Sequence, residues 1–333
     1  MINPVYAAAP ERYENGMKYR RCGKSGLVLP EISLGLWHNF GDVDTFAESR
    51  NKILYAFDHG ITHFDLANNY GPSFGSAEET FGAVMKKDLR PYRSEIIVST
   101  KAGHSMWPGP YGDGCSRKNI MASIDQSLQR MNLDYVDIFY SHRYDPETPL
   151  EETLQALVDI VRQGKALYVG ISKYPRELAD YAYKYLAERD VPCLIYQGRY
   201  NIFNREPEIE GILDSAKEHG VGFIAFSPLA QGLLTNRYLN GIPDDSRIAR
   251  GGYLKKESLT KETLGKIARL NEIAASRGQT LAEMALAWLL KNDKVTSVLV
   301  GASSVEQLGD NLLALRNTNF TDRELSDIDD ASK

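Results

Sequence analysis

Eight short β-rich runs recur along the chain, with helix-period stretches between most of them, and this alternation limits the fold more than any other feature. The runs lie at residues 32–37, 61–66, 95–101, 136–142, 167–172, 194–197, 222–227 and 295–300. Strands that alternate with helices form parallel sheets, because each helix carries the chain back to the start of the next strand. The sequence therefore predicts an α/β fold, either a closed (β/α)8 TIM barrel or an open doubly wound sheet.

The nearest match to a phosphate-binding loop distinguishes these two architectures. An open nucleotide-binding sheet needs a glycine-rich loop between a strand and the helix that follows it. The best candidate, Gly220-Val-Gly222, instead precedes and enters its strand, so the barrel is favoured. Residues 17–29 predict an N-terminal β-hairpin that turns at 24–26, and we expect extra C-terminal helices. No linker composition interrupts the chain, so residues 1–333 are predicted to form one domain.

One predicted helix carries both start and stop signals. Thr148 is placed as its N-cap, Pro149 in its first turn and Glu151 at the capping-box position. Gly164 supplies the C-terminal stop, because glycine accepts the left-handed backbone that often ends a helix. These signals predict a helix between residues 148 and 164.

The composition narrows the partners and the compartment. The net charge of −5 argues against a general nucleic-acid-binding surface, and the apolar stretches are too short to cross a membrane. Residues 1–10 lack the features of a secretory signal. Cys22, Cys115 and Cys193 are few and far apart, which favours free thiols in a reducing compartment. We expect a cytoplasmic protein without nucleic-acid or membrane partners; whether it forms a homo-oligomer stays open.

Four functional side chains follow three of the apolar runs. Asp65 closes one run with Tyr70 in the loop after it, Lys101 closes the next, and His142 the one after that. The carboxyl ends of barrel strands meet at one face, so we expect the four to converge. They suit proton delivery to a carbonyl group. The Lys101 ammonium is expected to lower the pKa of the Tyr70 phenol, Asp65 to orient Lys101, and His142 to hydrogen-bond the carbonyl oxygen.

The residues alone also allow other interpretations. The Asp–Lys pair can be an ordinary ion pair, or Lys101 a Schiff-base nucleophile as in barrel aldolases. A histidine such as His63 is commonly a satisfied core residue. His59 and His63 have a metal-like spacing, but Gly60 ends the helix between them, so we expect no metal site.

Five short motifs occur in a fixed order at the predicted strand ends. They are Leu34-Gly-Leu-Trp37, residues 64–71, Lys101-Ala-Gly103, Ser141-His142 and Gly301-Ala-Ser-Ser-Val-Glu-Gln-Leu308. Together they resemble the aldo-keto reductases, (β/α)8 enzymes that use NADPH, over nearly the whole chain. The resemblance implies that Tyr70 is the general acid, that Asp65 and Lys101 tune it, and that His142 orients the carbonyl group.

Three further motifs resemble particular branches of this family. Gly35-Leu-Trp-His-Asn-Phe-Gly41, residues 68–72 and residues 106–112 are most similar to the bacterial L-glyceraldehyde 3-phosphate reductases. The potassium-channel β-subunits are also similar, but typically have threonine where Leu36 stands. The resemblance implies NADPH-dependent reduction of small aldehydes, with L-glyceraldehyde 3-phosphate or methylglyoxal as substrates and methylglyoxal detoxification as a role. The alternative is an NADPH-binding, redox-sensing subunit that regulates a protein partner.

The resemblance also implies a set of residues that hold NADPH. The set is Trp37, Asp65, Ser172, Gln197, Ser227, Leu229, Gly232, Arg237, Gly301, Ser303, Gln307 and Asn311. Ser303 has two interpretations, an N-cap in a capping box with Glu306 and a phosphate ligand at a helix N-terminus. Arg237 and this helix start favour NADPH over NADH, since a 2′-phosphate needs cationic and N–H partners.

The substrate side is predicted from fewer signals. Trp37, Trp107 and Tyr111 are candidates for the wall of the mouth. A phosphorylated substrate requires a cation, for which Arg143, beside His142, and Arg199 are candidates. The predicted substrate site comprises Trp37, Tyr70, His142, Trp107 and Arg143.

Overall fold

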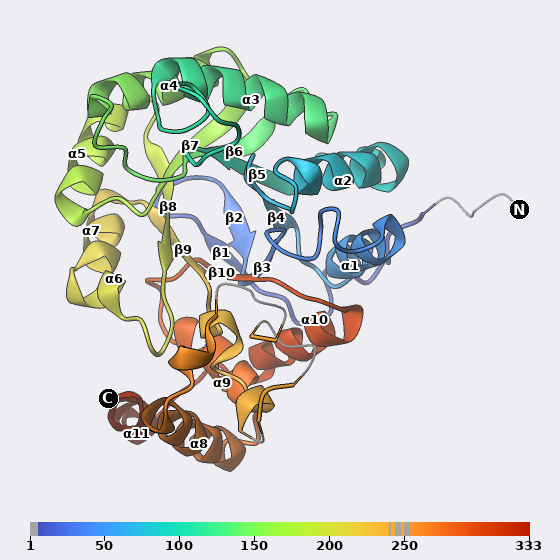
Figure 1. The fold of residues 1–333 in the computed structure, drawn as a ribbon, viewed down its shortest axis with the longest axis vertical. Coiled ribbons are helices and arrows are strands. Elements are labelled where there is room, and N and C mark those ends of the chain that lie inside the picture. Colours follow the sequence, from blue (N-terminus) through green and yellow to red (C-terminus); the bar gives the residue numbers. More distant parts are fainter. Residues whose placement is uncertain (1–5, 240, 244–247, 250–253) are drawn as a thin grey trace, which may run out of the picture.

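The structure is a computed structural model that describes residues 6–239, 241–243, 248–249 and 254–333. Residues 1–5, part of the segment predicted to carry no secretory signal, lie outside the described residues. Parallel strands close into a barrel in the order β10-β3-β4-β5-β6-β7-β8-β9, which confirms the predicted (β/α)8 architecture (Figure 1). The barrel strands are β3 (Ile32–Gly35), β4 (His63–Asp65), β5 (Ile97–Ala102), β6 (Val136–Ser141), β7 (Ala166–Ser172), β8 (Cys193–Arg199), β9 (Gly222–Phe226) and β10 (Ser297–Val300).

Helices surround the barrel, so each strand has one face toward the interior and one toward the helices (Figure 1). The helices are α1 (Phe46–Asp58), α2 (Ser76–Val84), α3 (Arg117–Met131), α4 (Leu150–Arg162), α5 (Arg176–Ala187), α6 (Glu206–Ile209), α7 (Ile212–His219), α8 (Lys261–Ser276), α9 (Leu281–Leu289), α10 (Val305–Leu312) and α11 (Asp322–Ser332). The predicted extra C-terminal helices include α11, which packs on α8 through a hydrogen bond from Arg269 to the Ala331 carbonyl (3.1 Å). Within the described residues, every helix is too short or too polar to cross a membrane.

The N-terminal hairpin, β1 (Tyr19–Arg21) and β2 (Val28–Pro30), closes the amino-terminal end of the barrel (Figure 1). Cys22 and Leu29 are fully buried and pack against interior residues such as Ile224. Gly23 has φ +56°, and a Cβ there would lie 2.0 Å from the Gly220 carbonyl oxygen. Only glycine fits so close an approach. The hairpin thus shuts one end of the barrel and leaves the carboxyl-end face open.

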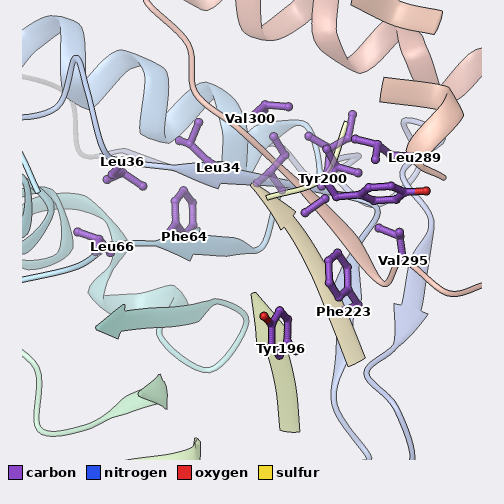
Figure 2. Packing of buried hydrophobic residues seen from close by; sticks show 14 of the residues in the cluster. Leu34, Leu36, Phe64, Leu66, Tyr196, Tyr200, Phe223, Leu289, Val295 and Val300 are labelled. Atoms are coloured by element: carbon purple, nitrogen blue, oxygen red, sulfur yellow. The ribbon is translucent and has the colours of Figure 1, made fainter. Parts of the chain in front are cut away.

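A continuous apolar core fills the space between barrel and helices (Figure 2). Leu34 of β3 pairs in register with Phe64 of β4, and both are fully buried. Tyr196 and Phe223 stack with ring centroids 5.8 Å apart. Each such side chain stabilises the fold by about 1.5–3 kcal/mol on burial. This core holds the strand ends in fixed positions relative to one another.

The start of α4 differs from its prediction. Pro149 is the N-cap, and no side chain of the described residues caps the helix. The Thr148 hydroxyl instead donates to Asp145 Oδ2 (2.8 Å), and Glu151 accepts a hydrogen bond from a tyrosine hydroxyl of α5. The predicted cap residues are therefore used by the preceding turn and by a neighbouring helix. Gly164 follows the helix at φ +71°, as the predicted stop requires.

Candidate active site

The structure brings Asp65, Tyr70, Lys101 and His142 together at the carboxyl end of the barrel. Asp65 ends β4, Lys101 lies near the end of β5, His142 follows β6, and Tyr70 enters from the loop before α2. Lys101 Nζ donates to Asp65 Oδ2 (2.6 Å) and to Tyr70 Oη (3.4 Å). The rings of Tyr70 and His142 meet edge to face with centroids 5.9 Å apart.

The Lys101 ammonium is fully buried and uses all three of its donors. Its third hydrogen bond goes to the Leu66 carbonyl oxygen (2.6 Å). Burial lowers the pKa of Lys101, and the carboxylate of Asp65 opposes that shift. An ammonium held by three acceptors has no lone pair to attack a carbonyl group, so the geometry disfavours the Schiff-base role for Lys101.

The pKa of Tyr70 differs in direction from the prediction. Burial, and then the negative charge of Asp65, raise the pKa of Tyr70 well above its usual value. The expected lowering by Lys101 does not occur, because the cost of burying a phenolate exceeds the attraction of one ammonium at 3.4 Å. Tyr70 therefore carries its proton at neutral pH and releases it only to a strongly basic partner.

His142 is held as a neutral imidazole. Burial lowers its pKa well below the usual value, and the nearby cations Lys101 and Lys173 lower it further. Its Nδ1 is buried and has no hydrogen-bond partner among the described residues. A neutral imidazole with an unused polar atom, beside the Tyr70 ring, suits hydrogen bonding to a ligand oxygen.

A chain of hydrogen bonds inside the barrel supports Asp65 from below. Ser99 Oγ donates to Asp65 Oδ1 (2.6 Å) and lies 2.9 Å from His63 Nε2, while His63 Nδ1 lies 2.9 Å from Ser33 Oγ. A carboxylate can only accept, so Ser99 must accept from His63 Nε2–H. Gln197 Nε2 adds a second donor to Asp65 Oδ1 (3.2 Å). His63 is thus an interior histidine with both ring nitrogens hydrogen-bonded, as its purely structural interpretation predicted. Through Ser99 it is also connected to Asp65.

A cavity of about 230 Å³ opens beside Asp65 and Tyr70 and is lined by most of the predicted cofactor residues. Those on its wall are Trp37, Asp65, Gln197, Ser227, Leu229, Gly232, Arg237, Gly301, Ser303 and Gln307. Ser172 and Asn311 do not line it, but Ser172 Oγ and Asn311 Nδ2 are buried without a partner in the described part of the chain.

The cavity wall also contains residues that were not singled out from the sequence: Phe226, Gln231, Thr235, Tyr238, Leu299 and Val300. They lie at the ends of β9 and β10 or in the segment after β9, and that position was the only signal. Short helical turns at Ala230–Gly232 and Asn236–Tyr238 shape the segment after β9. A turn of this kind leaves no periodic pattern to recognise.

The N-cap of α10 lies one residue later than predicted. Ser304 is the N-cap and accepts from Gln307 N–H (3.2 Å), so Ser303 and Glu306 do not form the box. Two adjacent serines are followed by Glu306 and Gln307, and either register satisfies the motif. The Ser303 hydroxyl and N–H donate to Gln307 Oε1 (2.9 and 2.7 Å) and lie at the cavity wall.

The predicted substrate residues divide into two groups. Trp37, Tyr70 and His142 lie together, with the Trp37 and Tyr70 rings 6.3 Å apart. Trp107 is exposed, as is its neighbour Tyr111, and neither lines the cavity.

The two arginines predicted as phosphate ligands also differ from that expectation. Arg143 is occupied by Asp113 (3.0 Å) and by the Gly103 carbonyl (2.8 Å), and Arg199 is exposed at the end of β8.

Two residues beside His142 were missed by the sequence reasoning. The His104 ring packs edge to face on His142, with centroids 4.4 Å apart, and Lys173 Nζ lies 2.9 Å from His104 Nε2. Each follows a motif residue closely, His104 after Lys101-Ala-Gly103 and Lys173 directly after Ser172. Their contact joins two loops and leaves no signal in either segment. Across the described ranges, no group of three His, Cys, Asp or Glu side chains is placed to hold a metal ion.

Comparison with known proteins agrees with this geometry. Residues 31–333 match the model of the aldo/keto reductase family. The chain is 57% identical to "L-glyceraldehyde 3-phosphate reductase" of Escherichia coli (strain K12) over 329 residues, which cover 98% of this chain and 95% of that protein. It is 38% identical to "Probable voltage-gated potassium channel subunit beta" of Arabidopsis thaliana over 305 residues, 90% of this chain and 91% of that one. The chain therefore belongs to the aldo/keto reductase family and is an oxidoreductase.

Proposed function

We propose that this protein reduces small aldehydes to alcohols with NADPH, and that Tyr70 is the proton donor. The observation that carries the proposal is the cluster of a protonated Tyr70, a fully engaged Lys101 and a neutral His142. All three groups meet at one end of the barrel, next to the cavity that Asp65 and Tyr70 line. This arrangement offers a carbonyl oxygen two hydrogen-bonding partners of different acidity.

The cavity fits a nicotinamide dinucleotide in its chemistry. The amide of Gln197 lines the cavity and suits the nicotinamide carboxamide. We assign to the same group Ser172 Oγ, which does not line the cavity but is buried without a partner in the described residues. Arg237 and the N-terminus of α10, next to Ser303, suit the 2′-phosphate that distinguishes NADPH from NADH. Gly232, at φ +99°, lines the same wall, where a side chain would be strained.

The proton step follows from the state of the four residues. When bound, NADPH supplies a hydride to the carbonyl carbon. The carbonyl oxygen, held by His142 and Tyr70, then gains negative charge and becomes basic enough to take the Tyr70 proton. Lys101, at 3.4 Å, stabilises the phenolate that remains, and Asp65 keeps Lys101 aligned. The barrel thus keeps the proton on Tyr70 until charge develops on the substrate.

L-Glyceraldehyde 3-phosphate is the proposed substrate, with methylglyoxal as a second one. The support is the 57% identity to the E. coli protein of that name. The test is NADPH oxidation, followed at steady state, with both enantiomers of glyceraldehyde 3-phosphate, methylglyoxal and an aromatic aldehyde. We expect the L-phosphate to give the highest kcat/KM. Equal kcat/KM for the two enantiomers would refute the substrate assignment but not the reductase activity.

A second candidate function is a redox-sensing subunit that binds NADPH and regulates a protein partner. The similarity to plant proteins named as probable channel β-subunits favours it. Leu36 stands where that branch typically has threonine, and this weakens the transfer of a channel role. Tight NADPH binding with slow turnover of every aldehyde in the panel would favour the subunit over the reductase.

We further propose that residues 1–333 form one domain and that the protein is cytoplasmic. The three cysteines are free and buried, which suits a reducing compartment.

A further inference from the structure

The pair of His104 and Lys173 extends the row of polar side chains beyond His142. The Tyr70 ring contacts the His142 ring edge to face, and the His142 ring contacts that of His104 in the same way. The Lys173 amine ends this row, 2.9 Å from His104 Nε2. The two residues come from different loops, His104 from the one after β5 and Lys173 from the one after β7. The proposed proton step uses neither of them.

Lys173 lies near the cavity wall without lining it, and it is paired with an imidazole instead of a carboxylate. Its ammonium lies 6.0 Å from the ring of Phe226, a residue of the cavity wall, and its backbone N–H donates to the Gln197 carbonyl (3.3 Å). Among the described residues, no Asp or Glu forms an ion pair with Lys173. A lysine without an anionic partner, beside an active site, is open to an anionic ligand.

The charges around Lys173 also favour binding of an anion. Partial desolvation, and the positive charges of Lys101 and Arg143, lower its pKa to about 8. Burial, and then the positive charges of Lys173 and Arg143, lower the pKa of His104 to about 4 against the opposing carboxylate of Asp113, so this imidazole is neutral. Cations that destabilise one another stabilise a bound anion.

The backbone at Lys173 is itself unusual. Lys173 has φ +58°, a left-handed conformation that is uncommon for residues other than glycine. Such strain is found at functional sites, where the surrounding structure holds the residue in place. In this conformation Lys173 contacts His104 Nε2 through its Nζ. Arg143 is already bound by Asp113, whereas Lys173, itself exposed, is a cation in contact with the imidazole next to His142.

We propose that Lys173, braced by His104, binds the phosphate group of a phosphorylated aldehyde whose carbonyl lies between Tyr70 and His142. This inference rests on the proposed reductase function and names the group that selects the substrate. A three-carbon aldehyde phosphate carries its anion at the end opposite the carbonyl. The row from Tyr70 through His142 to His104 and Lys173 matches that order of groups.

The test compares Lys173→Met with the wild type on L-glyceraldehyde 3-phosphate and on unphosphorylated L-glyceraldehyde. Loss of a charge-assisted hydrogen bond is expected to lower the kcat/KM ratio of the two substrates by about 10- to 100-fold, mainly through KM. Lys173→Arg keeps the charge and should keep most of the preference. Lys184→Met removes an exposed charge of α5 and should leave the ratio unchanged. The KM for NADPH serves as a check that the cofactor site is intact.

Inhibition by inorganic phosphate separates this inference from the substrate proposal. In the wild type, phosphate should compete with unphosphorylated glyceraldehyde, and Lys173→Met should abolish that competition. This result supports the anion site even when L-glyceraldehyde 3-phosphate is a poor substrate. A wild-type preference for the phosphorylated aldehyde that Lys173→Met leaves unchanged overturns the inference while the proposed function stands. Absence of both the preference and the phosphate inhibition in the wild type also overturns it.

Discussion

Replacing Ser99 by alanine tests whether the hydrogen-bond chain inside the barrel positions Asp65. Ser99 is fully buried, and its hydroxyl is both a donor to Asp65 Oδ1 and the acceptor for His63 Nε2–H. The Ser99→Ala variant loses a hydrogen bond to a carboxylate and leaves a buried N–H of His63 without an acceptor. Loss of one carboxylate hydrogen bond costs about 1.5–3 kcal/mol, and an orphaned buried donor costs a further 1–3 kcal/mol, roughly.

The expected total is about 3 kcal/mol, near the lower end of the combined range. Gln197 and Lys101 still hold Asp65 in the variant, which limits the loss. Catalysis should also suffer, because an Asp65 that can rotate no longer holds Lys101 aligned with Tyr70. A displacement of this kind is expected to lower kcat by about tenfold.

Ser33→Ala is the matched control. Ser33 is equally buried and bonds the far side of His63, but it does not touch Asp65. Urea unfolding and steady-state NADPH oxidation are measured for both variants. The control should lose about 1 kcal/mol of stability with little change in kcat. Equal effects of Ser99→Ala and Ser33→Ala on kcat would refute a positioning role for the chain.

Two further predictions concern pH and the start of α10. Burial lowers the pKa of His63 from 6.5 to about 4, so the folded state keeps it neutral while the unfolded chain takes up a proton below pH 6.5. The free energy of unfolding should therefore fall as the pH drops from 6.5 toward 4. Between pH 7 and pH 5, urea unfolding should show that the wild type loses about 2 kcal/mol more stability than His63→Gln. Equal losses of stability in the two proteins would contradict the shift in the His63 pKa. Ser304→Ala should cost about 1 kcal/mol as a lost N-cap without changing the KM for NADPH. Ser303→Ala should raise that KM, and the reverse pattern would restore the sequence-based assignment of the cap.

The barrel could be predicted because its signal is repeated along the chain. Eight apolar runs separated by helical stretches are compatible with few architectures. The glycines at Gly220 precede their strand and so do not form a phosphate-binding loop, which argued against the open doubly wound sheet. The convergence of Asp65, Lys101 and His142 followed from the same rule, since barrel strands end at one face. Tyr70 lies in the loop directly after β4, so it could be expected to reach the same face.

The remaining features depend on contacts between segments that lie far apart in the sequence and share no pattern that would predict the contact. The Ser33–His63–Ser99 chain needs the register of three strands, and the His104–Lys173 pair needs two loop conformations. The direction of the Tyr70 pKa shift required the degree of burial, which strand alternation does not measure. The predicted N-cap was wrong by one residue where two adjacent residues fit the same motif, as at Ser303 and Ser304.

The most direct test of the central claim is turnover by Tyr70→Phe together with its affinity for NADPH. The substitution removes the phenolic proton and keeps the ring that packs against His142. NADPH oxidation with L-glyceraldehyde 3-phosphate should fall by about 100-fold or more, the usual loss for a general acid. NADPH binding, measured by fluorescence titration, should stay within about threefold of the wild type. Turnover close to that of the wild type, with the cofactor bound normally, would contradict the assignment of Tyr70 as the proton donor.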